Sequence, residues 1–311
     1  MDFDLSDDQR AILEAVTQLL EQHAGPARAI ELNAKGGVDR ELDAALADAG
    51  FDAIALADEA GYLEAALVTE AVARAGGVIS IGAQALVAPA LLGRTLPGPV
   101  AISHVAHRGP VRFAAQARTL LLDGGSEARL VTLEPGECSP VKSGFMYPMG
   151  SLALDAGAGE SLGPGSGAKL RDWWRLALAV EAAGAMKAAL DVTVDYVKRR
   201  RQFGRAIGSF QAVQHRLSEC AVLIEGARWI AFEAAYQGAP AGAAATAAAY
   251  ATAAANQVFA ETHQLTGAMG FTREHDLHVF SMRLQALRLE AGGVSGHRLA
   301  AARARWLPES P

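Results

Sequence analysis

Two places in the sequence combine residue types that could hold a phosphate-bearing ligand. The first is Arg200-Arg201-Gln202-Phe203-Gly204, which continues to Phe210 and Gln211, and the second is Gln264 to Phe271. An arginine at a helix end, just before a glycine turn, can present its guanidinium fork to a pyrophosphate. The amides of Gln211 and Gln264 can hydrogen-bond to adenine, ribose or phosphate. Together these residues indicate a possible nucleotide-binding surface.

Each of these residues also has an ordinary structural explanation. Arg200 belongs to a run of four basic residues, Lys198 to Arg201, which is typical of a solvated face. A glutamine such as Gln211 is commonly a polar surface residue, and Gly267 or Gly270 could simply end a helix. The prediction therefore depends on the spacing of the residues together and on no single residue.

The elements that would position these residues are mainly helices. Ser6 and the acids after it are typical of a helix start, and apolar residues recur at helical spacing from Ile12 to Leu20. Further helices are predicted over residues 40–49, 63–75 and 81–92, and again over 173–200, 211–237, 241–269 and 276–289. The high content of Ala and Leu favours helix as well.

The middle of the sequence has a different character. Short apolar runs at residues 111–113, 119–122 and 130–133 alternate with Gly, Pro and Ser, which predicts short strands. Residues 157–167 are rich in Gly, Ser and Pro and are interpreted as a linker. We therefore expect a mainly α protein with an N-terminal helical domain (1–97), a reduced β middle domain with its linker (98–167) and a C-terminal four-helix bundle (168–311).

Composition excludes several classes of protein. The 28 basic and 34 acidic residues give a net charge of −6 without a broad basic surface, so nucleic acid is not an expected partner. The two cysteines, Cys138 and Cys220, form no CxxC pair, which argues against a zinc site and fits a reducing compartment. His275 and His278 lack further ligands at metal-binding spacing, so no metal site is expected. The polar N-terminus and the lack of a long apolar run predict a cytoplasmic protein without membrane spans.

Both of these candidate ligand-binding segments resemble motifs of the acyl-CoA dehydrogenase family. Residues 200–211 are similar to its R-x-x-F-G…FQ segment, and residues 264–271 are similar to its Q-x-x-G-G-x-G-F turn. The resemblance implies the family's fold of helices, β domain and four-helix bundle. It also implies FAD and an oligomer, because these positions reach a neighbouring subunit's FAD. The implied cofactor-binding residues are Arg200, Gln202, Phe203, Phe210, Gln211, Gln264, Leu265, Gly267 and Ala268.

The sequence departs from the family where the family carries its catalytic base. The dehydrogenation needs a carboxylate to remove the α-proton of an acyl-CoA while a hydride leaves the β-carbon. At the family's two usual base positions this chain has Gly292 and Trp174, and Glu290 lies two residues before the first of them. Val294 and Gly296 replace a Thr and a Gln with which the family binds FAD within the subunit. No residue is therefore assigned as the base, and Glu290 is only a weak candidate.

The loss of a subunit's own flavin contacts, with those to a neighbour kept, resembles the degenerate subunit of actinobacterial α2β2 acyl-CoA dehydrogenases acting on steroid side-chain CoA thioesters. Residues 270–278 are similar to a run found in that group. The resemblance implies a full-length homologous partner in a heterotetramer, an acyl-CoA substrate and an electron-transfer flavoprotein. Two alternatives stay open: a self-sufficient enzyme with Glu290 or Asp172 as an unusual base, and a flavin-free structural protein.

Overall fold

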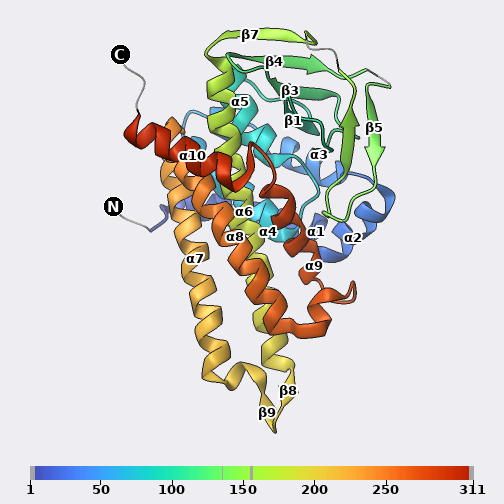
Figure 1. The fold of residues 1–311 in the computed structure, drawn as a ribbon, viewed down its shortest axis with the longest axis vertical. Coiled ribbons are helices and arrows are strands. Elements are labelled where there is room, and N and C mark those ends of the chain that lie inside the picture. Colours follow the sequence, from blue (N-terminus) through green and yellow to red (C-terminus); the bar gives the residue numbers. More distant parts are fainter. Residues whose placement is uncertain (1–3, 135, 155–156, 308–311) are drawn as a thin grey trace.

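The computed structural model describes residues 4–134, 136–154 and 157–307. Helices dominate, and two small sheets cover one side of the long central helix near its start (Figure 1). Within the described ranges, no helix combines the length and apolarity that crossing a membrane requires. The expected mainly α class is confirmed.

The N-terminal part of the chain consists of short helices that pack on one another and on the long helix α6 (Ser166–Arg199). They are α1 (Asp7–His23), α2 (Pro26–Lys35), α3 (Arg40–Asp48), α4 (Tyr62–Ala75) and α5 (Ala88–Leu92), with a 3-10 turn η1 (Ile54–Leu56) and a π-helical turn η2 (Gly82–Val87). Helix α1 begins with the capping box formed by Ser6 and Gln9. Helices α4 and α6 approach closely at Gly184, which has no side chain. A Cβ there would lie 2.4 Å from the carbonyl oxygen of Glu70.

Between residues 100 and 164 the chain forms two sheets. The strands are β1 (Val100–His104), β2 (Val111–Arg112), β3 (Thr119–Asp123), β4 (Glu127–Thr132), β5 (Cys138–Val141), β6 (Met149–Leu152) and β7 (Glu160–Pro164). The four-stranded sheet has the order β1-β3-β4-β7, with β1 parallel to β3 and the other pairs antiparallel. The three-stranded sheet has the order β2-β6-β5, in which Arg112 pairs with Met149 and Met149 with Val141.

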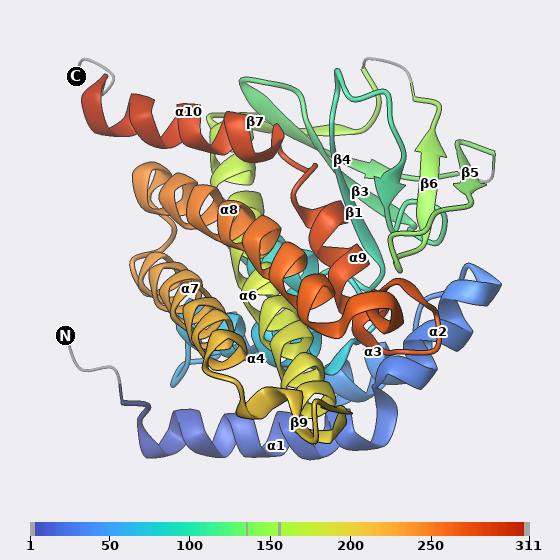
Figure 2. The same cartoon turned by 60° about the horizontal axis from the view of Figure 1, so that its bottom comes forward.

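The C-terminal part is a bundle whose helices lie side by side around α6 (Figure 2). Its other helices are α7 (Gln211–Tyr236), α8 (Ala241–Thr266) and α9 (Leu277–Leu287), and α10 (Gly293–Trp306) packs on α8. Alanines on the inner face of α8, such as Ala247 and Ala251, are completely buried and permit close packing against α6 and α7. The expected four-helix bundle is confirmed.

Short irregular elements complete the bundle at the end of α6 opposite the two sheets. A hairpin of β8 (Arg201–Gln202) and β9 (Arg205–Ala206) follows α6 directly and leads through η3 (Ile207–Ser209) into α7. It forms the lower tip of the molecule in Figure 1. The turn η4 (Gly267–Phe271) follows α8.

The structure differs from the sequence-based expectation in several elements. Residues 157–167, predicted as a linker, contain strand β7 and the start of α6, because backbone pairing with β4 and not side-chain propensity makes β7 a strand. The predicted helix over 81–92 is π-helical in its first half. Helix α10 was not expected after the predicted last helix, since its first turn contains Gly293 and Gly296. The predicted domain boundaries themselves stay a prediction.

Candidate functional site

A cavity of about 810 Å³ lies between the two sheets, the start of α6 and the turn that joins α9 to α10. The cavity is lined by Trp174 and Gly292, which stand at the two expected base positions. Glu290 lines it as well. These residues come from segments more than a hundred positions apart in the sequence. The fold therefore brings both base positions to one chamber, and neither carries a carboxylate.

Glu290 is held by three hydrogen bonds at the edge of this cavity. The Arg112 Nε donates to Glu290 Oε1 over 2.7 Å, and the Arg112 Nη2 donates to Oε2 over 3.4 Å. The indole Nε1 of Trp174 donates to the same Oε2 over 3.0 Å. A carboxylate with both oxygens in charge-assisted or indole hydrogen bonds is fixed in place. It is poorly suited to turn toward a substrate and accept a proton.

The same guanidinium also pairs with a second, deeper carboxylate. Arg112 Nη1 donates to Glu181 Oε2, and the Glu181 side chain is 5% exposed. Burial raises the pKa of Glu181, and the neighbouring guanidinium offsets only part of that rise. Burial also works against the charge on Arg112, but the two carboxylates outweigh it and keep the pKa of Arg112 above its ordinary value. We call Arg112, Glu181, Glu290 and Trp174 the buried network.

The backbone around Glu181 is shaped to admit this side chain. A Cβ on Gly82, in the π-helical turn η2, would lie 2.4 Å from Glu181 Oε1. Only glycine therefore leaves room for the carboxylate, and the widened turn brings its backbone against it. On its other side the Arg112 guanidinium lies 4.9 Å from the ring centre of Tyr147. The buried network is thus enclosed by protein on several sides.

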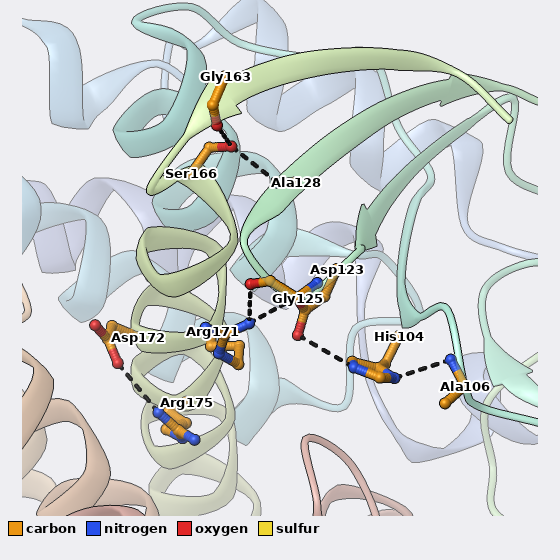
Figure 3. Close-up of polar contacts among 10 residues, drawn as sticks. All are labelled: His104, Ala106, Asp123, Gly125, Ala128, Gly163, Ser166, Arg171, Asp172 and Arg175. Atoms are coloured by element: carbon orange, nitrogen blue, oxygen red, sulfur yellow. Dashed lines mark hydrogen bonds and ion pairs between the residues drawn. The ribbon is translucent and has the colours of Figure 1, made fainter. Parts of the chain in front are cut away.

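A second polar group lines the cavity from the four-stranded sheet, and Figure 3 shows it. Arg171 Nη1 donates to Asp123 Oδ1 and to the carbonyl oxygen of Gly125, each over 2.7 Å. His104 Nε2 lies 4.0 Å from Asp123 Oδ2, and His104 Nδ1 accepts from the backbone N–H of Ala106. These contacts tie the start of α6 to the ends of β1 and β3.

Asp172, the other alternative base, lies elsewhere. Its carboxylate accepts from Arg175 over 3.1 Å, and Figure 3 shows this pair on the side of α6 away from Asp123. Burial raises the pKa of Asp172, which would suit a base. It is not among the residues that line the cavity, however, so it has no access to a substrate placed beside Trp174 and Gly292.

The residues implied to bind a cofactor at the hairpin lie far from the cavity. From Trp174 to Arg200 the helix rises about 40 Å. Arg200, Gln202 and Gln211 are exposed, whereas Phe210 is half-buried under the guanidinium of Arg205, which lies 3.9 Å from its ring centre. Phe203 is 90% exposed at the tip of the hairpin.

The hairpin turn adopts a conformation that most residues avoid. Phe203 has a φ of 52° and Gly204 a φ of 80°, as a tight two-residue hairpin turn requires. Glycine tolerates this at no cost, but a phenylalanine in the left-handed region is strained. The strain places an aromatic ring in solvent instead of in the core of the same chain. Such a feature is typical of a contact made with another molecule.

The second implied segment lies at the end of α8 and the start of η4. Gln264, Gly267 and Ala268 are exposed, and Leu265 is buried. Gly267 has a φ of 58°, and a Cβ there would meet no atom within 4 Å. An ion pair of 2.5 Å between Arg216 of α7 and Glu261 of α8 holds this segment against the start of α7. Gln211 and Gln264 therefore lie at neighbouring helix ends.

Two members of the buried network, Arg112 and Glu181, were not predicted from the sequence. Glu181 stands in an alanine-rich helix with apolar residues on both sides, and a lone acid buried there is itself a signal, because it must find a cation. Arg112 stands in a two-residue strand, and nothing in its local sequence indicates its partners. Across the described residues, no group of three or more His, Cys, Asp or Glu side chains is arranged to hold a metal ion.

Comparison with known proteins supplies the frame for these observations. A family model described as "Acyl-CoA dehydrogenase, N-terminal domain" matches residues 6–94, and one described as "Acyl-CoA dehydrogenase, C-terminal domain" matches residues 170–304. The residues between them, 95–169, contain the two small sheets.

One curated relative matches almost the whole chain. The acyl-CoA dehydrogenase IpdE2 of Mycobacterium tuberculosis is 31% identical over 293 residues, which cover 89% of this chain and 91% of that protein. Among solved structures, a chain of the ChsE4–ChsE5 complex from Mycobacterium tuberculosis superposes with a TM-score of 0.82 at 23% identity, over all of both chains. A variant of the Tcur3481–Tcur3483 steroid ACAD superposes with a TM-score of 0.78 at 25% identity, over 95% of this chain and 97% of that one.

Proposed function

The chain belongs to the acyl-CoA dehydrogenase family, and we propose that it is the subunit of a heteromeric enzyme that helps to hold a partner's FAD. In this proposal the partner is a homologous full-length subunit that carries the glutamate base. The complex catalyses α,β-dehydrogenation of an acyl-CoA thioester. This chain contributes contacts to the adenosine and pyrophosphate half of the FAD.

The observation that carries the proposal is the state of the chamber in which this chain would need a base. Both base positions line the cavity without an acid, and the one acid beside them, Glu290, is bound on both oxygens by Arg112 and Trp174. Proton abstraction needs a carboxylate that can reach the substrate with a free lone pair. Glu290 does not meet this requirement, and Asp123, the other acid in the cavity wall, is paired with Arg171, so we assign the base to the partner.

Family membership implies FAD as the cofactor, and the two ends of this chain fit it differently. At the hairpin end, Arg200, Gln211 and Gln264 are exposed and make no side-chain hydrogen bond or ion pair to other described residues. Their donors are free to bind phosphate, ribose or adenine oxygens and nitrogens. The strained, exposed Phe203 adds an aromatic ring beside them. This surface fits half of an FAD approached from outside the chain.

At the cavity end, the residues of this chain do not fit a flavin that this chain would hold alone. Val294 and Gly296, in the first turns of α10, have no side-chain group with which to hydrogen-bond a cofactor. When bound, FAD accepts the hydride that leaves the β-carbon of the substrate. The residues of this chain would hold the far half of the cofactor, exclude water from it and leave the proton transfer to the partner.

The finer features of the proposal rest on the resemblance of residues 270–278 and on the relatives. One structural relative is described as a steroid ACAD, which favours a steroid side-chain CoA thioester as substrate. Another is a complex of two different chains, which favours a heterotetramer. The electron acceptor that we propose is an electron-transfer flavoprotein.

Co-expression with a full-length homologue from the same genome tests the proposal. We expect the two chains to co-purify as a yellow complex with about one FAD per pair of unlike chains, and to oxidise an acyl-CoA only together. The chain purified alone should contain little flavin. A stable homo-oligomer of this chain that is loaded with FAD and active would contradict the proposal, and so would an active complex without flavin absorbance.

A further inference from the structure

The cavity that has lost its base keeps the properties of a small-molecule site. Its volume of about 810 Å³ lies within the range of roughly 300–1,000 Å³ that is usual for ligand pockets. Most of its wall is apolar, formed by side chains such as Ile102, Val111, Phe145 and Leu289. A chamber of this size and polarity favours a ligand with an apolar body.

The charged side chains in its wall are almost all neutralised within the chain. Arg112 is paired with Glu181 and Glu290, and Arg171 is paired with Asp123. Among the described residues, Lys142 is the one charged lining side chain without an ion pair. It follows β5 directly, at the end of the strand where Val141 also lines the cavity. An unmatched ammonium group at the wall of an apolar chamber favours a ligand with one anionic group.

The acids in or beside the cavity wall, in contrast, are held by neighbouring side chains, since Asp123 is paired with Arg171. Glu290 is held by Arg112 and Trp174, and the deeper Glu181 is not in the cavity wall. An acyl group that entered would meet apolar side chains, the buried network and the paired side chains of Arg171, Asp123 and His104. The chamber is therefore suited to binding without chemistry.

We propose that this cavity is a non-catalytic binding site for an apolar carboxylate, whose anionic group is bound by Lys142 and whose body fills the apolar chamber. This inference goes beyond the proposed function, since it needs neither FAD nor a partner subunit. The ligand class is a free carboxylic acid with an extended or ring-shaped hydrocarbon body, and not its CoA thioester, because one lysine can match one carboxylate but not the several charges of a CoA group.

Titration calorimetry on the full-length chain tests the site with decanoate as the probe. We expect decanoate to bind more tightly than decanol, because only the acid can pair with Lys142. The variant Lys142→Met should weaken decanoate binding about three- to tenfold and leave decanol binding unchanged. Lys142→Glu should weaken decanoate further, by repulsion. Lys169→Met, at an exposed lysine outside the cavity wall, is the matched control and should change neither affinity.

Three results would contradict the proposal that this cavity binds an apolar carboxylate. The first is equal binding of decanoate and decanol, and the second is decanoate binding that is the same in Lys142→Met and the parent chain. The third is decanoyl-CoA binding that is tighter than decanoate and indifferent to Lys142. None of these results depends on FAD content or dehydrogenase activity, so failure of this inference leaves the proposed function standing.

Discussion

The two ends of helix α6 treat their charged and polar groups in opposite ways. At its start, the buried network satisfies Arg112, Glu181 and Glu290 inside the chain. At its end, the side chains of Arg200, Gln211 and Gln264 are exposed and form no hydrogen bond or ion pair within the described residues, and Gln202 bonds only to the neighbouring carbonyl oxygen of Arg201. The two regions lie about 40 Å apart along one helix.

The paired, buried groups at the start of α6 stabilise the fold, whereas the exposed groups at its end are available to bind another molecule. A buried charge must be paired, or it costs several kcal/mol, so the buried network is needed for stability whatever the chain does. The exposed Arg200 forms no side-chain hydrogen bond or ion pair within the described residues, and the strained Phe203 is 90% exposed although the edge of its ring meets Phe210. The hairpin end is therefore where we expect contacts with another molecule, and the cavity end is where the acid nearest to the expected base positions is held by its own chain.

The largest expected effect is the loss of stability when the buried network loses its cation. Arg112→Met leaves Glu181 and Glu290 without their cation, and we expect it to lower the free energy of unfolding by about 3–5 kcal/mol. Urea denaturation followed by circular dichroism measures this. Arg118→Met, at an exposed arginine, should stay within about 0.5 kcal/mol of the parent chain. A loss for Arg112→Met no greater than that for the control would show that the buried network does not support the fold.

A second prediction concerns how the stability of the chain depends on pH. His297 in α10 is completely buried, and burial, with a smaller contribution from Arg175, lowers its pKa from 6.5 to about 4. Since the folded pKa lies below the unfolded one, its stabilising contribution is present above about pH 6.5 and is lost as the pH falls toward 4. We expect this loss to be about 2–3 kcal/mol.

The variant His297→Leu should remove that part of the pH dependence. Between pH 7 and 4 the unfolding free energy of the parent chain should fall by about 2–3 kcal/mol more than that of the variant. His215→Gln, at an exposed histidine, should follow the parent curve. A constant difference between His297→Leu and the parent chain over this range would mean that His297 does not titrate as its burial indicates.

The smallest effect concerns the acid nearest to the base position. In the complex with its partner, Glu290→Gln should leave kcat unchanged within about twofold, because Glu290 is bound by Arg112 and Trp174 and not by substrate. Its cost should appear as about 1 kcal/mol of stability, since the amide weakens the pairing with Arg112. A fall in kcat of a hundredfold or more, with the complex still folded, would make Glu290 the base.

Sequence reasoning predicted the elements whose signals are local. The helices predicted over residues 40–49 and 63–75 are α3 and α4, and the helices predicted over 173–200, 211–237 and 241–269 are the long helices of the bundle. It missed β7, which exists because β4 supplies hydrogen-bond partners, and α10, whose glycines disfavour helix until α8 packs against it. Local propensity cannot report partners that lie far away in the sequence.

The residues of the candidate site also include some that the sequence predicts and some that depend on partners far away in the sequence. Trp174 and Gly292 were found because they align with a family pattern, and the structure places both in one cavity. The pairing of Glu290 beside that cavity could not be predicted, since it depends on Arg112 of β2 meeting Glu181 of α6 and Glu290 beyond α9. The residues implied to bind FAD stay a prediction, although their exposure is what a contact across an interface requires.

The most direct test of the contrast is the affinity of the complex for FAD when Arg200 is removed. In the co-expressed complex, Arg200→Ala should raise the Kd of FAD about ten- to thirtyfold, because a charge-assisted hydrogen bond to phosphate is lost. The thermal stability of the isolated chain should not change, and Lys198→Ala, in the same basic run, should leave FAD binding as it was. An unchanged Kd for Arg200→Ala would contradict the account, because the hairpin end would then hold no part of the cofactor.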